Sequence, residues 1–379
     1  MTNEQILKIY GTDYRRNTRT LLEAADLAAR IPSANSRILI KPNLVSPVPA
    51  SAGGTTHPEI VAGIIEYLQA HGFSRLRIAE GSWVGDRTPE AFDCCGYYAL
   101  ARRYGVELLD TQQDTFYSAD CGGMTLKICS CVRQADFIIN VPVLKGHCQT
   151  KITCALKNMK GLIPNAEKRR FHALGLHKPI AHLSAGIRQD FLVVDHICGD
   201  LDFEDGGNPV VRDCIMAAAD PVLTDAYVCH LLHYRPEDVP YLTLAAELGV
   251  GSLDLTRAEI LTLGDSRPEE LPYTRKVVEL ADAVTEVESC SACYGYLIPA
   301  LDRLKEEGLF SRLTEKICIG QGFRGQTGTL GVGNCTRGFA FCVEGCPPTE
   351  NQIYEQLKAY LSFVQPESQK ESADGTQAS

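Results

Sequence analysis

The stretch DFIINVPVL (residues 136–144) is short, apolar and rich in β-branched side chains, which is typical of a strand buried on both faces of a sheet. Similar runs recur along the first 265 residues and are separated by amphipathic stretches such as PEIVAGIIEYLQAHG (58–72). Strands that alternate with helices predict an α/β fold: a mainly parallel sheet with helices on both faces. The other expected strands are ILKIYGTD (6–13), RILIKPNLV (37–45), RLRIAEGS (75–82), FLVVDHIC (191–198) and EILTLG (259–264).

The chain divides at a polar stretch, GDSRPEELPYTRK (264–276). We expect an α/β domain over residues 1–270 and a cysteine-rich α/β segment over 285–365. The last residues, 366–379, are polar and rich in Ser, Gln and Gly, which predicts a disordered tail.

Composition limits the class of protein. The 379 residues are 45% hydrophobic and 22% charged, which is ordinary for a globular protein. No apolar run approaches the length of a membrane span, and the N-terminus does not have the pattern of a signal peptide. We therefore expect a cytoplasmic protein without a membrane partner. The net charge of −10 argues against nucleic acid as a partner.

Positive charge is concentrated in one part of this acidic chain. Between Lys145 and Lys178 there are eight Lys and Arg residues and a single acid, Glu167, so this stretch carries +7 and the rest −17. A basic island of this kind predicts a local site for a small anion.

Five cysteines lie close together in the C-terminal segment. The first two form C-x-x-C, a third follows the glycines of GVGN, and the last two form C-x3-C-P, which echoes the end of a bacterial ferredoxin motif. Glycine lets the backbone approach inorganic sulfide, and exposed N–H groups can hydrogen-bond to it. We predict a [4Fe–4S] cluster with four cysteine ligands and Cys342 in reserve: Cys290, Cys293, Cys335 and Cys346.

Two other interpretations of these cysteines stay open: a structural zinc site and unrelated buried thiols. We expect nine of the eleven cysteines elsewhere in the chain, all except Cys148 and Cys154 of the basic island, to be small buried hydrophobes. They are Cys94, Cys95, Cys121, Cys129, Cys131, Cys198, Cys214, Cys229 and Cys318.

Several blocks, in this order, resemble the DUF362 family: KPNLV (41–45), TTHPEIV (55–61), NVPVLKGHCQTKITCALKNMKGLIP (140–164), Lys168 and His172, FLVVDHI (191–197), GGNPV (206–210) and AADPVLTDA (218–226). The resemblance implies an α/β domain that is often associated with iron–sulfur binding. Many members resemble ferredoxin fusions with a C-x2-C-x2-C-x3-C repeat. This chain lacks that repeat, so its cluster would depend on the C-terminal cysteines.

Polar residues follow the predicted strands where open α/β sheets bind ligands, at the carboxyl ends. Lysine and histidine there would suit a carboxylate or phosphate. The alternative for some of the lysines is a solvated helix face, and His57 is as easily explained by its place before a helix. The expected catalytic residues are Lys145, His147 and His172, and the expected anion-binding residues are Lys41, Asn43, Lys157, Asn158 and Lys168.

Three hypotheses about function follow. The first is an iron–sulfur oxidoreductase that acts on a small anionic substrate or cofactor, with a possible redox partner protein. It requires the C-terminal segment to fold against the carboxyl edge of the sheet, so that the cluster lies near the basic island. The second is a non-enzymatic electron-transfer or cluster-carrier protein. The third is a binding protein in which zinc or a cluster only holds the C-terminal segment together.

Overall fold

The computed structural model describes residues 1–204, 206–267, 270–273 and 276–363. The chain forms two compact units, Met1–Thr274 and Arg275–Ser379. The predicted tail, residues 366–379, lies outside the described residues.

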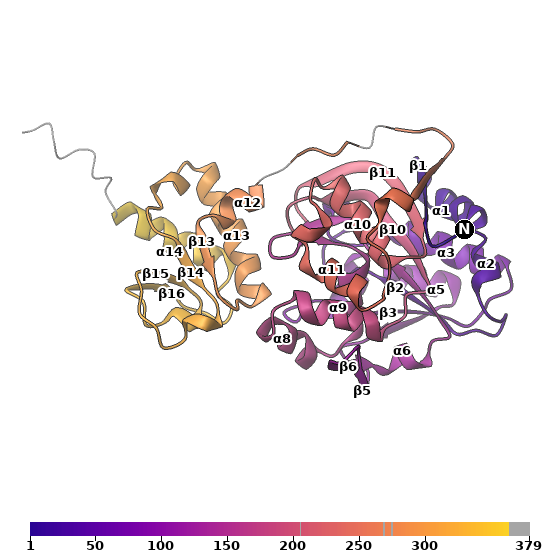
Figure 1. Ribbon diagram of the computed structural model, residues 1–379, viewed down its shortest axis with the longest axis horizontal. Helices are drawn as coiled ribbons and strands as arrows, with labels where there is room; N and C mark the ends of the chain where they lie inside the picture. Colours follow the sequence, from indigo (N-terminus) through magenta and orange to yellow (C-terminus); the bar gives the residue numbers. More distant parts are fainter. Residues whose placement is uncertain (205, 268–269, 274–275, 364–379) are drawn as a thin grey trace, which may run out of the picture. The chain divides into compact units, whose positions relative to one another are not determined.

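The described part of the first unit contains an eight-stranded sheet with the order β12-β1-β11-β10-β7-β2-β3-β4 (Figure 1). Strands β10, β7, β2, β3 and β4 are parallel neighbours, whereas β11 pairs antiparallel with both β10 and β1. The predicted mainly parallel sheet is therefore confirmed. The strands are β1 (Gln5–Tyr10), β2 (Ile38–Pro42), β3 (Leu76–Glu80), β4 (Glu107–Asp110), β7 (Phe137–Val141), β10 (Phe191–Asp200), β11 (Pro209–Ala218) and β12 (Glu259–Leu263).

Helices cover both faces of this sheet, as predicted. Alternate residues of one strand enter different apolar cores: Ile138 belongs to one cluster, and Phe137 and Ile139 belong to the other. The strand runs are continuously apolar because each strand is buried on both faces. The helices are α1 (Tyr14–Ala24), α2 (Leu27–Arg30), α3 (Pro58–Ala70), α4 (Thr88–Cys94), α5 (Tyr97–Tyr104), α6 (Ser130–Gln134), α7 (Ala155–Asn158), α8 (Asn165–Ala173), α9 (His177–Gly186), α10 (Pro221–Leu231) and α11 (Pro240–Glu247).

Two hairpins extend beyond the main sheet. Strand β5 (Phe116–Asp120) pairs with β6 (Thr125–Cys129), and β8 (Lys145–His147) pairs with β9 (Lys151–Thr153). The second hairpin leads the chain from the carboxyl end of β7 into α7 and the short 3-10 helix η2 (Met159–Leu162). The basic island, residues 145–178, therefore starts just after the carboxyl end of β7.

The second unit contains a parallel sheet that has, among the described residues, the four strands β13 (Val284–Glu286), β14 (Ile317–Ile319), β15 (Leu330–Val332) and β16 (Phe341–Val343). Its helices are α12 (Lys276–Ala281), α13 (Ser291–Glu306) and α14 (Glu350–Phe363). The apolar residues of α13 and α14, such as Leu301 and Leu357, are fully buried.

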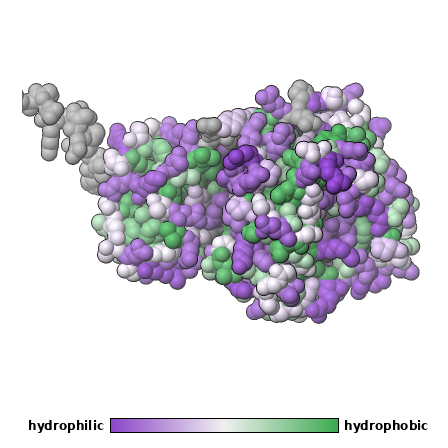
Figure 2. All heavy atoms as spheres, in the orientation of Figure 1, coloured by the Kyte–Doolittle hydropathy of each residue, from purple (hydrophilic) through white to green (hydrophobic). Residues whose placement is uncertain are grey.

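On the face shown in Figure 2, hydrophilic residues cover much of the surface, with hydrophobic residues in smaller groups between them. Within the part of the chain that the structure describes, no helix has the length and apolarity needed to cross a membrane.

Candidate functional site

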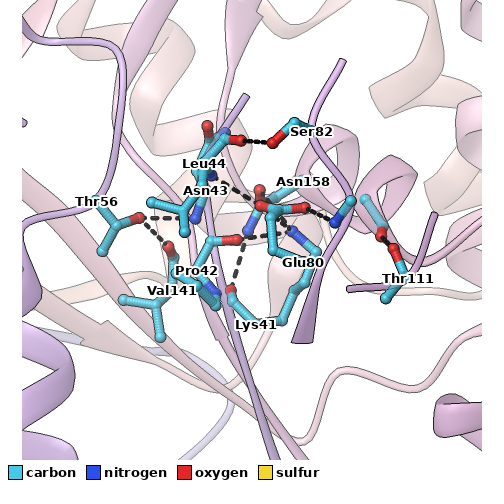
Figure 3. A network of polar contacts seen from close by, with 12 residues as sticks. Lys41, Pro42, Asn43, Leu44, Thr56, Glu80, Ser82, Thr111, Val141 and Asn158 are labelled. Carbon is cyan, nitrogen blue, oxygen red and sulfur yellow. Dashed lines mark hydrogen bonds and ion pairs between the residues drawn. The ribbon is translucent and has the colours of Figure 1, made fainter. Parts of the chain in front are cut away.

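A buried ion pair lies at the carboxyl edge of the main sheet. Lys41 of β2 is 2.9 Å from Glu80 of β3, and both side chains are almost completely buried (Figure 3). The two carboxylate oxygens of Glu80 also accept the backbone N–H groups of Leu44 and Gly81, at 2.8 and 2.7 Å. Burial lowers the pKa of Lys41, and the neighbouring Glu80 opposes that shift. The ammonium of Lys41 is thus bound by groups of the protein, chiefly the Glu80 carboxylate.

Asn158 links this pair to the neighbouring strand. Its amide nitrogen donates to Lys41 O at 3.2 Å and to Asn140 Oδ1 at 2.7 Å, and its Oδ1 accepts from Lys41 Nζ at 3.3 Å. The helix that carries Asn158 starts where the Asp225 carboxylate accepts the N–H groups of Ala155 and Leu156. Burial raises the pKa of Asp225 to about 7. The amide of Asn158 is therefore positioned by its hydrogen bonds with Lys41 and Asn140 and by the fixed start of its helix.

Two glycines let the backbone approach these side chains closely. A Cβ atom at Gly161 would lie 2.0 Å from Glu80 Oε1, and one at Gly81 would lie 2.2 Å from Thr111 Oγ1. Thr111 in turn donates to Gly161 O at 2.6 Å (Figure 3). Lys168 of α8 donates to the carbonyl oxygens of Gly81 and Ser82, both at 2.8 Å. The chain at this edge has no room for a larger residue at either glycine.

A second group of basic side chains surrounds Glu204. Lys157 forms an ion pair with Glu204 Oε1, and His147 Nε2 lies 2.8 Å from Oε2 without the alignment of a hydrogen bond. His147 Nδ1 accepts the N–H groups of Gln149 and Thr150, so the neutral ring carries its proton on Nε2, facing Glu204. Burial lowers the pKa of His147 to about 4.

The side chain of Lys145 holds the loop that carries Glu204 by binding backbone carbonyl groups. Its ammonium donates to Gly54 O at 2.5 Å and to Glu204 O at 2.6 Å, and it lies 3.5 Å from Asn43 Oδ1. Burial raises the pKa of the Glu204 carboxyl, but its neighbours His147 and Lys157 outweigh burial and hold that pKa well below the usual range. The basic residues His147 and Lys157 therefore already bind a carboxylate, which is the side chain of Glu204.

Lys160 and His172 complete the basic group. Within the described part of the chain, the ammonium of half-buried Lys160 makes no hydrogen bond or ion pair. Burial and the nearby charge of Lys157 lower the pKa of Lys160 to about 7. Burial and Lys160 lower the pKa of His172 to about 2, and burial lowers that of Lys168 to about 8. Burial is the main cause of each of these shifts, and the charge of a neighbouring lysine adds to it for Lys160 and His172.

The structure thus brings together the predicted site residues of the first unit. Lys41, Asn158 and Lys168 form one group and Lys145, His147 and Lys157 another, while Asn43 and His172 contact or electrostatically couple to the second. Lys157 is buried, so the solvated helix face does not apply to it. Sequence reasoning missed Glu204, whose only signal was an acid just before Gly206 and Gly207.

The C-terminal cysteines follow the carboxyl ends of parallel strands. Cys290 is the N-cap of α13 after β13, Cys335 follows β15 and Cys346 follows β16. Burial and then the charges of Cys290, Cys346 and Cys335 raise the pKa of Cys293 to about 12, so these three thiols lie within electrostatic range of Cys293. Around them, Gln321 Nε2 lies 3.7 Å from Cys290 Sγ, and interaction with Cys335 raises the pKa of the Arg324 guanidinium.

Cys342 differs from these four cysteines in its contacts, although burial and, to a smaller extent, the charge of Cys335 raise its pKa. Its thiol is 3.3 Å from Thr336 Oγ1 and 3.4 Å from Gly333 O. Across the described residues, no three His, Cys, Asp or Glu side chains are arranged to hold a single metal ion. The expectation of burial is wrong for Cys94, which faces solvent at the end of α4, while its neighbour Cys95 enters the core. Cys318 is only partly buried.

Fold and site together define an α/β protein with a crowded basic site at the carboxyl edge of its sheet. Residues 38–230 match the family described as a domain of unknown function (DUF362), and the chain belongs to this family.

The "Thylakoid-associated protein sll1697" of Synechocystis sp. is 26% identical over 253 residues, which are 64% of this chain and 76% of that protein. The structure of the lactate racemase apoprotein from Thermoanaerobacterium thermosaccharolyticum aligns with a TM-score of 0.40 and 14% identity. That alignment covers 61% of this chain and 58% of the racemase chain.

Proposed function

We propose that this DUF362 protein is a cytoplasmic iron–sulfur oxidoreductase that acts on a small anionic substrate or cofactor, a carboxylate or a phosphate. The observation that carries the proposal is the crowding of Lys157, Lys160, Lys168, His147 and His172 at the carboxyl edge of the sheet. Desolvating so many basic groups is costly, and a bound anion would offset that cost.

The residues divide the work of binding. Lys160, which lacks a partner among the described residues, would bind the anion first, as the point charge that lysine provides. The Glu204 side chain is 25% exposed, and its carboxylate lies between His147 and Lys157. In this proposal, two oxygen atoms of the ligand would bind at the same position. The incoming ligand would replace Glu204 there, and the Nε2 proton of His147 would then face the ligand.

The cluster in this proposal is a [4Fe–4S] group held by Cys290, Cys293, Cys335 and Cys346. Two observations support this donor set: the other three thiols influence Cys293 electrostatically, and Gly333, with φ 89°, brings its backbone to Cys293, so that a Cβ atom there would lie 3.5 Å from Cys293 Sγ. When bound, the cluster would supply electrons one at a time. Transfer to the anion requires the two to lie close, and that proximity stays a prediction.

Two measurements test the proposal. Protein purified anaerobically should contain about four iron and four sulfide per chain by the stoichiometry of such clusters, with an EPR signal after reduction. Calorimetry with inorganic phosphate and with acetate should show binding that Lys160→Gln weakens at least about tenfold, which is the scale of one charge-assisted contact. Zinc in place of iron, or unchanged binding by the variant, would contradict the respective half of the proposal.

A further inference from the structure

A third polar cluster lies in the first unit and shares no residue with the anion site. His57 precedes α3, and Asp195 and Cys198 belong to β10. His57 Nδ1 lies 2.8 Å from Asp195 Oδ2, and His57 Nε2 lies 3.9 Å from Cys198 Sγ. A thiol, an imidazole and a carboxylate are thus arranged in series. From the sequence alone, His57 was ambiguous and Cys198 was expected to be an inert buried thiol.

The carboxylate fixes both the position and the tautomer of the imidazole. Asp195 Oδ2 accepts the backbone N–H of His57 at 2.7 Å, and Oδ1 accepts the N–H of Ile197 at 3.1 Å. Because Asp195 is fully buried and ionised carboxylates only accept, Nδ1 of His57 must carry a proton. The free nitrogen, Nε2, therefore faces the thiol of Cys198 and can take its proton.

The thiol has one other acceptor in reach. Cys198 Sγ donates to Ala50 O at 3.4 Å, a weak contact of the kind found in structural cysteines. Burial lowers the pKa of His57, but Asp195 and Cys198 outweigh burial and raise it to about 10. A raised pKa makes this imidazole a stronger base, so that Nε2 can hold a proton taken from the neighbouring thiol. A purely structural cysteine would need neither the histidine nor the carboxylate behind it.

The strand pairing is irregular at this point. The register of β10 with β11 shifts between His196 and Cys198, and Asp213 on β11 has a left-handed backbone at φ 50°. Asp213 accepts the hydroxyl of Tyr14 at 2.7 Å, and the Tyr14 ring lies 5.8 Å from the His57 ring. Irregular pairing re-aims side chains and is frequent next to active sites.

A surface hollow is lined by Tyr14, whose ring is near His57, and by Pro58, which follows His57, although His57, Asp195 and Cys198 are not among its lining residues. Its volume is about 510 Å³, and its lining also includes Leu100. The His57 side chain keeps 12% of its exposure. Cys198 is 4% exposed, so only a small reagent would reach its sulfur.

We propose that Cys198, His57 and Asp195 form a nucleophilic thiol site that accepts an acyl group from a small activated ester or thioester. His57 takes the proton of the Cys198 thiol, and the sulfur attacks the carbonyl carbon. A sulfur–carbon bond forms, the bond from the carbonyl carbon to the leaving oxygen or sulfur breaks, and the leaving group departs with the proton from His57. No electrons are exchanged with an oxidant, and the product is a thioester on Cys198.

The experiment uses p-nitrophenyl acetate on the full-length protein, with release of p-nitrophenolate followed optically and the acetylated peptide identified by mass spectrometry. We expect a burst of about one equivalent, an acetyl group on Cys198, and no burst in Cys198→Ser. His57→Gln should slow acetylation of Cys198 by about a hundredfold, the lower end of general-base effects.

The matched control is Cys94→Ser, because Cys94 is an exposed cysteine outside this cluster. It should leave acetylation of Cys198 unchanged. Circular dichroism and thermal melting establish that each variant is folded; if His57→Gln does not fold, Asp195→Asn replaces it, with a smaller expected loss. Acetylation that is absent from Cys198 in the wild-type protein, or as fast in the folded histidine variant, would overturn the proposal.

Discussion

Lys160 is the residue at which the electrostatics of the anion site can be tested most directly. Its ammonium is half-buried and has no hydrogen-bond or ion-pair partner in the described chain, and burial with the charge of Lys157 lowers its pKa to about 7. An isolated surface lysine would be fully charged at that pH. The charge of this one therefore depends on whether an anion is bound, because a bound anion favours the protonated form.

This predicts a pH dependence of binding. Because the pKa of Lys160 is lowered to about 7, its charge is half lost at about pH 7 and nearly complete only well below it, so the affinity for a carboxylate should level off at low pH and fall as the pH rises. The fall should approach about tenfold per pH unit for one linked proton. Calorimetry with acetate between pH 6 and 9 measures it, since acetate itself stays ionised there.

Lys160→Gln provides the control for that profile. The variant should bind acetate more weakly and with a flatter dependence on pH, and any slope that remains would report Lys168, whose pKa burial lowers to about 8. An unchanged slope in the variant would show that another group controls the dependence.

Glu204 gives a second prediction at the residue scale. Its carboxylate contacts His147 and Lys157, so it competes with an external carboxylate for both. Glu204→Gln keeps the size of the side chain and removes its charge. We expect acetate to bind several-fold to about tenfold more tightly, which corresponds to about 1 kcal/mol. Glu90→Gln is the control, because Glu90 pairs with Arg87 on α4. Weaker binding in the Glu204 variant would make Glu204 part of the binding surface.

At the scale of the elements, the short helix η2 packs its backbone at Gly161 directly against the Glu80 side chain at the end of β3. Gly161→Ala would place a Cβ atom 2.0 Å from Glu80 Oε1 and disturb the buried pair of Glu80 with Lys41. We expect a loss of about 2–4 kcal/mol in the free energy of unfolding, as for other disturbed buried pairs. Denaturant titration measures the loss. Gly295→Ala, a helical site with open space around it, should cost nothing.

Cys342 tests the ligand set of the C-terminal loops. Its thiol contacts Thr336 and Gly333, whereas Cys293 is an electrostatic neighbour of Cys290, Cys335 and Cys346. Cys342→Ser should keep the iron content and the visible absorbance of anaerobically purified protein, and Cys293→Ser should lose most of both. The reverse result would make Cys342 a ligand.

Sequence patterns predicted the buried strands well and the polar or exposed ones poorly. All six strands named from apolar runs are present, because burial on both faces leaves a continuous signal. Strand β11 was missed because its first half is exposed or only partly buried and includes Arg212 and Asp213, and β4 was missed because it is a short edge strand. The antiparallel pairing of β11 with β1 and β10 could not be inferred from composition, since it depends on contacts between segments that are distant in the sequence.

The site was predictable in part for the same reason. Lys145 and His147 were found because they follow a strand end, where the position of the sheet edge fixes their surroundings. Glu204 was not, because it lies in a loop whose path depends on Asp200, which accepts the N–H groups of Asp202, Phe203 and Asn208. The relation of His57 to Cys198 is spatial, and no spacing in the sequence indicates it.

At the scale of the whole molecule, the basic residues all belong to the unit Met1–Thr274 and the clustered cysteines to the unit Arg275–Ser379. Binding of acetate or phosphate should therefore survive loss of iron. We expect Cys293→Ser to change the dissociation constant of acetate by less than about twofold, within the scatter of independent sites. A large change would show that the cluster contributes to the anion site.

The close packing at Gly81 and Gly161 has an evolutionary consequence. Lys41 and Glu80 next to these glycines lie on strands and form a buried pair, whereas the charged residues of the Glu204 group come from a hairpin, short helices and a loop beyond the strands. Substitution in the Glu204 group can thus change ligand preference while the Lys41–Glu80 pair stays intact, whereas a side chain at either glycine collides with its neighbours. Relatives that have diverged toward different anions should differ most within residues 145–172 and 200–208 and should retain both glycines.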